Sequence, residues 1–189
     1  MSVTILKSIV QTSLVVTASV LFSSFMAAED RVITPPLREE FASPDQRYVF
    51  ELSTPDNWRS GKSVGRLLEG NGASRRVLWT RPLPHQFRPR YVLVGDTGNV
   101  LLVDEWANVK SRFAVMVLDR QNQLVAQHDF EAVRKVLDLP VAQVVGKARL
   151  GWWIVSGPTL EASGGTAVVE TAGKRLRIRI ADGNLSLAQ

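Results

Sequence analysis

The stretch from Tyr91 to Phe130 constrains the fold more than any other part of the chain. Short apolar runs alternate here with turn clusters that contain Gly, Asn and Asp. This alternation is typical of a β-meander, in which tight turns join neighbouring antiparallel strands. The run from Phe113 to Leu118 is apolar at every position, so we expect a strand that is buried on both faces.

Other segments extend the same pattern. Apolar residues alternate with arginines from Arg175 to Ile180, as in a strand with one core face and one wet, basic face. Phe130 to Leu137 has apolar residues at helical spacing, and Pro140 opens a second short helical signal, which Val141 to Val145 continue. Arg149 to Ser156 is interpreted as a further strand. We predict a mainly β fold of antiparallel meander and hairpin repeats with a short helical insertion, arranged as a partial propeller-like array or an open sandwich.

Three windows of the chain share one layout, a polar turn that leads into an apolar strand. They are Ser43 to Phe50, Gly95 to Leu102 and Ala162 to Val169, and the apolar strands that follow them are Val77 to Trp79, Phe113 to Leu118 and Leu176 to Ile180. This layout resembles the blade motif of TolB-type β-propellers, in which a Ser-Pro-Asp-Gly turn leads into a strand; Gln46 stands where that motif has Gly. A closed propeller needs about four blades or more, so the resemblance implies a repeat-built, partly open β architecture. It carries over no catalytic residue, because the functions of propellers vary.

Residues 1–28 have the layout of a Sec-type signal peptide. Lys7 supplies a basic start, Ile9 to Met26 is an apolar run, and Ala27-Ala28 precedes a charged segment. The alternative is an uncleaved N-terminal anchor, because the apolar run is nearly long enough to span a bilayer. The Ser and Thr residues in the run, together with Gln11, favour cleavage. Both interpretations place the protein outside the cytoplasm, in the periplasm, in the extracellular space or anchored to the envelope.

The rest of the chain divides into two parts. Residues 29–42 contain Pro35-Pro36 and mixed charges, and we predict an extended lead-in. Residues 43–189 are long enough to bury one hydrophobic core, so we predict a single β-rich domain.

Composition excludes several kinds of chemistry. The chain has no cysteine, which rules out disulfides and Cys-based metal sites. The two histidines, His85 and His128, have no metal-ligand spacing, and no phosphate-binding, dinucleotide-binding or nucleophile motif is present. We predict no metal site and no cofactor. Asp104 and Glu105 are neighbours on a strand and should point to opposite faces, so they do not form a facing carboxylate pair.

A segment rich in arginine is the best candidate for binding. Its predicted ligand residues are Arg75, Arg76, Trp79, Arg81, Arg88 and Arg90. Guanidinium groups bind carboxylate and phosphate with paired hydrogen bonds, and the formal net charge of +5 also favours anionic partners. The alternative interpretation is a solubilising loop, because exposed charge is the default.

These observations favour an exported, non-catalytic binding or interaction module of the cell envelope or periplasm. The candidate partners are an anionic polysaccharide, a lipid headgroup or a protein; no nucleic-acid motif is present, and membrane contact is expected only if residues 1–28 stay uncleaved. The alternative is a hydrolase whose carboxylates, such as Glu51, Asp104 and Glu105, meet only in the tertiary structure.

The signal peptide leads to the first testable prediction. We expect the mature protein to begin near residue 28 or 29, because signal peptidase cuts after small residues such as those at Ala27-Ala28. N-terminal sequencing of the mature protein measures this directly. An intact Met1 in a soluble cytoplasmic fraction would contradict export.

Overall fold

The computed structural model describes residues 34–70 and 72–188. The signal peptide predicted for residues 1–28 lies outside this range, as does the first part of the predicted lead-in. Within the described residues no helix is both long enough and apolar enough to cross a membrane.

The strands form three four-stranded antiparallel meanders, which confirms the predicted mainly β fold. The first sheet contains β1 (Arg38–Ala42), β2 (Tyr48–Ser53), β3 (Val64–Glu69) and β4 (Arg76–Pro82). The middle sheet contains β5 (Pro89–Val94), β6 (Val100–Glu105), β7 (Val115–Leu118) and β8 (Leu124–His128). The last sheet contains β9 (Ser156–Leu160), β10 (Thr166–Thr171), β11 (Lys174–Arg179) and β12 (Leu185–Leu187). A short 3₁₀ helix, Gly72–Ser74, connects β3 to β4.

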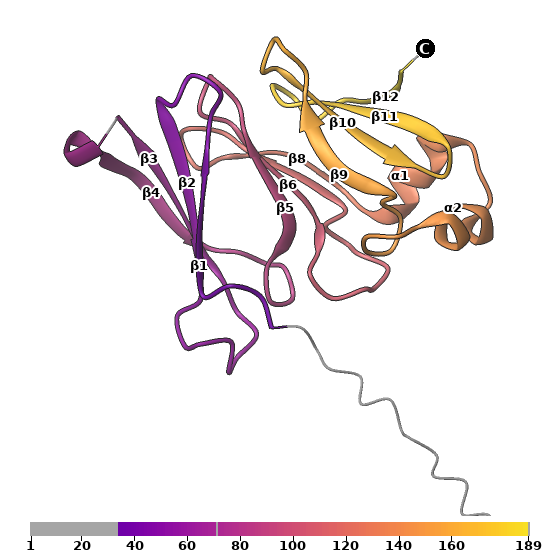
Figure 1. Ribbon diagram of the computed structural model, residues 1–189, viewed down its shortest axis with the longest axis horizontal. Helices are drawn as coiled ribbons and strands as arrows, with labels where there is room; N and C mark the ends of the chain where they lie inside the picture. Colours follow the sequence, from indigo (N-terminus) through magenta and orange to yellow (C-terminus); the bar gives the residue numbers. More distant parts are fainter. Residues whose placement is uncertain (1–33, 71, 189) are drawn as a thin grey trace, which may run out of the picture. The chain divides into compact units, whose positions relative to one another are not determined.

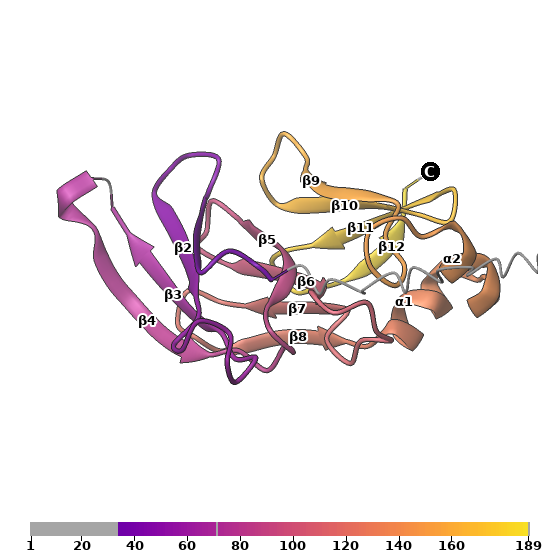
Figure 2. The ribbon, with the colours of Figure 1, turned by 60° about the horizontal axis from the view of Figure 1, so that its bottom comes forward.

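Two short helices lie between β8 and β9, where the sequence predicted a helical insertion. They are α1 (Phe130–Leu137) and α2 (Val141–Lys147). The Asp129 carboxylate accepts a hydrogen bond from the backbone N–H of Ala132 at 2.8 Å, which satisfies one of the free donors at the start of α1. α1 contacts β8 and β12, and both helices lie at one end of these sheets (Figure 1, Figure 2).

The middle sheet is buried on both faces. Leu102 and Met116 pack with Phe50 and Trp79 of the first sheet in one hydrophobic core. The residues next to them on the same strands, including Leu101 and Val117, pack with the last sheet in a second core. Successive strand residues point to opposite faces, so β6 and β7 supply both cores at once. This confirms the expectation that the apolar run ending at Leu118 is buried on both sides.

The three turns of the predicted repeat are the first hairpin turns of the three sheets, and they lie side by side. The backbone N–H of Asp45 donates to Asp96 Oδ1 at 3.0 Å, which joins the first two turns. Asn99 Nδ2 donates to the carbonyl of Ile180 at 3.2 Å, and the Ile180 N–H donates to Gly165 O at 2.9 Å, which brings in the third. The first strands also lie next to each other, since β5 contacts both β1 and β9 (Figure 1). Equivalent elements of the repeat therefore meet.

Some boundaries differ from the sequence prediction. The strand predicted for Arg149 to Ser156 is wrong: that segment forms turns with one isolated bridge, Leu150 to Ile154, and the strand begins at Ser156. The dipeptide Gly157-Pro158 hid the strand β9 from the sequence prediction. Proline is tolerated here because β9 is an edge strand. β1 lies within the predicted lead-in, 29–42.

Two further differences concern the arginine-rich segment and the repeat. The sequence also suggests an irregular loop from Arg81 to Arg90, because this stretch holds several prolines, but its ends, Arg81-Pro82 and Pro89-Arg90, belong to β4 and β5. In the first sheet the third strand of the meander is β3, and Val77 to Trp79 belongs to the fourth. The windows therefore marked the right turns but not always the right third strand.

The outward faces of the first and last sheets carry charge. In the first sheet Glu51 pairs with Arg38 at 2.6 Å and with Arg66 at 3.3 Å. In the last sheet Arg177 pairs with Glu161 at 2.6 Å, while its strand neighbour Leu176 lies in the core. Terminal repeats with polar outer faces stay soluble, so three sheets suffice without closure into a ring.

The burial of β7 predicts the effect of a charge placed in it. Val115 is fully buried, so Val115→Asp should cost several kcal/mol of folding free energy, because its carboxylate would have no partner in the core. Val77→Asp is the matched control, since Val77 is 46% exposed on β4, and it should cost about 1 kcal/mol or less. Urea unfolding of both variants measures the difference. Equal costs would show that the middle sheet is not buried on both faces.

Candidate functional site

The six ligand residues predicted from the sequence do not form one array. Arg75 pairs with Glu40 at 3.0 Å, and Arg76 pairs with Glu69 at 2.6 Å, both on the first sheet. Trp79 is buried in the core between the first and middle sheets. Arg75 and Arg76 therefore already have carboxylate partners within the fold.

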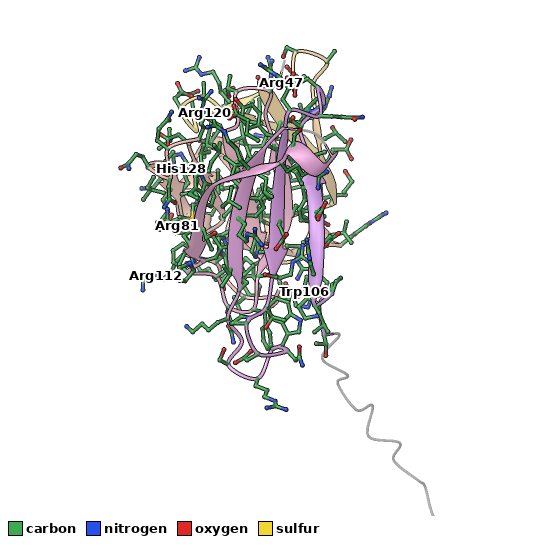
Figure 3. The ribbon with its side chains drawn as sticks, turned by 90° about the vertical axis from the view of Figure 1, so that its left-hand side faces the viewer. Arg47, Arg81, Trp106, Arg112, Arg120 and His128 are labelled. Atoms are coloured by element: carbon green, nitrogen blue, oxygen red, sulfur yellow. The ribbon has the colours of Figure 1, made fainter. Side chains whose placement is uncertain are left out.

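The other three arginines also have internal partners; Arg81 lies at the far end of β4, and Arg88 and Arg90 lie at the start of β5. Arg81 donates to Asn122 Oδ1 at 3.2 Å. The guanidinium groups of Arg88 and Arg90 both lie near the ring of Trp106, and Figure 3 shows Trp106 on the opposite side of the view from Arg81.

Arg88 is the most buried member of the predicted set. It is only 2% exposed and pairs with Glu39 at 2.6 Å. Arg90 Nε donates to the backbone carbonyl of Glu105 at 3.1 Å. Anion binding by the set stays a prediction, and an anion there would share each guanidinium with an internal partner.

The two neighbouring acids at the end of β6 point in different directions, as expected. Glu105 accepts hydrogen bonds from the backbone N–H of Gln86 at 2.9 Å and from Ser111 Oγ at 3.0 Å. Asp104 faces the other way, where Oδ2 accepts a 3.4 Å bond from the backbone N–H of Trp152. These contacts separate the carboxylates, so they do not act on a common substrate atom.

Asp104 is an unusual buried acid. It is fully buried, and its backbone is left-handed with φ of 56°. Burial raises the pKa of its carboxyl group from 3.8 to about 6, and hydrogen bonds from backbone N–H groups only partly offset this rise. Because no surface of Asp104 reaches solvent, we assign it a structural role at the junction with Trp152.

The histidines have separate surroundings. His128 Nε2 forms a 2.9 Å hydrogen bond with the carbonyl of Gly183. His85 is buried against Phe113, and burial lowers the pKa of its ring to about 3, so the ring is neutral at ordinary pH. Among residues 34–70 and 72–188, no three or more His, Asp or Glu side chains gather in a way that suits a metal ion.

A different set of cations surrounds two adjoining hollows in the last third of the chain. We call this region the basic hollow. Its hollows have volumes of about 510 Å³ and 330 Å³ and share Val155 and Gly173. The cations that line them are Lys147, Arg149, Lys174 and Arg175.

Local structure explains why these cations meet. α2 ends at Lys147, and the extended backbone at Ala148 leads directly to Arg149. The turn between β10 and β11 is tight, with left-handed Ala172 (φ 49°) and Gly173 (φ 82°) at its centre. Lys174 and Arg175 follow this turn at once, and side-chain alternation along β11 points Arg175 away from the core.

The basic hollow has more positive than negative charge. None of its four cations forms an ion pair with a carboxylate in the part of the chain that the structure describes. Lys174 Nζ donates to the backbone carbonyl of Leu137, the last residue of α1, where the helix dipole favours a cation. The acidic residue that lines the hollow is Glu170, which accepts a 2.9 Å bond from Ser156 Oγ. An anion can therefore be held here without breaking an existing ion pair.

Sequence reasoning missed this set for a physical reason. It identified the basic face of β11, but Lys147 and Arg149 come from a segment far upstream. Lys147 and Arg149 come close to Lys174 and Arg175 only because the two helices return the chain to β9. No local sequence pattern specifies that path. A cation count also does not show which arginines are already paired.

No family model matches the chain, and a search of curated proteins finds no match. The case for function therefore depends on the geometry.

The raised pKa of Asp104 predicts a pH-dependent stability. The folded protein holds this proton more tightly than the unfolded chain, so stability is lost as pH rises from about 4 to about 6. At 1.36 kcal/mol per pKa unit the loss is about 2–3 kcal/mol. The Asp104→Asn side chain cannot ionise, and asparagine tolerates the left-handed backbone. Between pH 4 and pH 7 the free energy of unfolding of this variant should therefore rise by about 2–3 kcal/mol relative to wild type.

Urea unfolding at pH 4 and pH 7 tests this prediction. His85 contributes in the opposite direction, because its lowered pKa adds stability as pH rises from about 3 to 6.5, but it does so equally in both proteins. Asp138→Asn is the control for the substitution itself, since Asp138 is also left-handed but exposed, and it shows what the Asp-to-Asn change does outside the core. A difference between Asp104→Asn and wild type that is the same at both pH values would contradict the prediction.

Proposed function

We propose that this protein is an exported, non-catalytic binding module whose basic hollow binds an anionic polysaccharide. The observation that carries the proposal is the set of four cations around two adjoining hollows, none of them paired with a described carboxylate. Export is supported by the signal-peptide layout of residues 1–28.

The internal partners of the arginines favour the basic hollow over the arginine-rich segment. Arg88 is buried and already paired with Glu39, so an anion at Arg88 would compete with a carboxylate that the fold supplies. Arg149 and Arg175 are exposed and lose only bound water when an anion arrives. Binding of an anion at the basic hollow therefore costs less free energy, because no internal ion pair is disturbed.

The form of the site favours a polymer over a single small anion. The two hollows lie next to each other and open to the surface, so neighbouring anionic groups of one chain can occupy both. Guanidinium groups at Arg149 and Arg175 bind sulfate, phosphate or carboxylate with paired hydrogen bonds, while Lys147 adds a point charge.

A hydrolase receives less support from the same geometry. A glycosidase needs two carboxylates about 5–10 Å apart across a cleft. The basic hollow presents Glu170 as its acid, and Asp104 is closed to solvent. A binding role is therefore the function that the geometry supports best.

Binding to dextran sulfate, with neutral dextran for comparison, tests the proposal. The double variant Arg149→Ser/Arg175→Ser should bind dextran sulfate at least about tenfold more weakly than wild type, because a charge-assisted hydrogen bond contributes about 1.5 kcal/mol or more. Binding should also weaken as salt rises, since the Debye length is about 10 Å at 0.1 M and shortens further. Calorimetric titration at low and high salt measures both effects.

The matched control is Arg112→Ser/Lys135→Ser, which removes the same charge from two other exposed positions that form no ion pair with a described carboxylate. It should retain nearly all of the wild-type affinity. Equal weakening in the two double variants would mean that net charge alone attracts the polymer, and equal binding of dextran and dextran sulfate would also overturn the proposal.

A further inference from the structure

A separate hollow, distinct from the basic hollow, lies between the loop after β2 and the loop after β4. We call it the loop pocket. Its volume is about 380 Å³, which falls in the usual range for small-molecule sites. The residues that matter for its chemistry are Trp58, Arg59, Lys62, His85, Phe87 and Glu105.

The two loops that form this pocket are fixed against each other. The Phe87 N–H donates to the carbonyl of Gly61 at 2.8 Å, which joins the two loops, and the Trp58 indole N–H donates to the carbonyl of Pro35 at 2.8 Å, which fixes the first loop to the segment before β1. The rings of Trp58 and Phe87 pack with centroids 6.2 Å apart. A ligand that enters therefore meets walls that are already ordered, which lowers the entropy cost of binding.

Backbone strain concentrates in the same two loops. Trp58 and Phe87 are left-handed, with φ of 66° and 61°. Such a conformation is unfavourable for a bulky residue and persists only where the surroundings hold it; it is often found at ligand sites. The strain and the cross-loop bonds point to the same small region.

The polar groups are arranged by depth. Arg59 and Lys62 are exposed at the rim, and neither pairs with a carboxylate among the described residues. Glu105 is buried at the floor, and each of its oxygens accepts one hydrogen bond from the protein. A carboxylate oxygen has room for a second bond, so the floor can still accept from a ligand hydroxyl.

His85 closes the back of the pocket. It is 1% exposed, and neither ring nitrogen has a hydrogen-bond partner among the described residues. The neutral ring adds no charge, and its nitrogens are enclosed by the protein, so the ring shapes the back of the pocket and does not bond the ligand.

These features define a ligand by its parts. The cationic rim favours a carboxylate, the floor at Glu105 favours a hydroxyl group, and the ring of Phe87 favours a flat apolar face. An ammonium group is disfavoured, because two rim cations exceed the single carboxylate below them. We propose that the loop pocket binds a sugar acid, a ring-shaped polyhydroxy carboxylate of about one monosaccharide unit.

Titration with glucuronate tests this proposal, with glucose and benzoate as comparison ligands. Glucose lacks the carboxylate, and benzoate is a flat anion that lacks the hydroxyl groups. We expect saturable binding of glucuronate, with glucose and benzoate each at least about tenfold weaker, because each lacks one class of hydrogen bond. Calorimetry or protein NMR with the full mature chain measures the three affinities.

Variants locate the site. Arg59→Ser/Lys62→Ser should weaken glucuronate binding at least about tenfold, and Arg59→Lys, which keeps the charge, should weaken it less. The control Arg112→Ser/Lys135→Ser removes equal charge outside the pocket and should leave glucuronate affinity unchanged. Absence of glucuronate binding, equal binding of benzoate, or equal weakening by the control would overturn the proposal. Because dextran sulfate reports on a different surface, either proposal can fail without the other.

Discussion

The structure depends on the burial of both faces of the middle sheet. β6 and β7 carry apolar residues at every other position on each side, so neither face can be left in water. Covering two faces requires two further sheets, and the first and last meanders supply them. The three-sheet arrangement is thus a consequence of the composition of two central strands, and the helices follow as the connection that brings the chain from β8 back to β9.

Charged side chains on the first and last sheets explain why the stack can end at three sheets. Arg38, Glu51 and Arg66 form a network on the outward face of the first sheet, and arginines cover the outward face of the last. Exposed pairs of this kind contribute little to stability, about 0–1 kcal/mol each. Their effect is to make both outer faces compatible with water. An open stack of three repeats therefore needs no fourth sheet to cover it.

The two ends of the sheets have different roles. At one end the first hairpin turns of the repeats bond to each other, and Arg47 reinforces them by donating to the carbonyl of Asp96 at 2.8 Å. Cations there are occupied by internal partners. The loop pocket lies at the loops that leave β2 and β4, and it retains strained backbone and two cations, Arg59 and Lys62, that pair with no carboxylate in residues 34–70 and 72–188. Groups that stabilise the fold and groups that remain available to a ligand are thus separate.

Periodicity by itself determined the mainly β fold, α1 and α2, the double burial of the run that ends at Leu118 and the basic face of β11. Each of these depends on neighbours a few residues apart, where side-chain direction follows directly from backbone geometry. The edge strand β9 was not predicted at its true position, because Gly157-Pro158 lacks strand propensity and gains its pairing only from β10. Which arginines are free was decided by tertiary structure alone. Arg88 meets Glu39, 49 residues away, because β5 lies beside β1, whereas Arg149 meets no described carboxylate. Burial and ion pairing are set by which distant segments come together, and this is why both candidate sites emerged only from the folded chain.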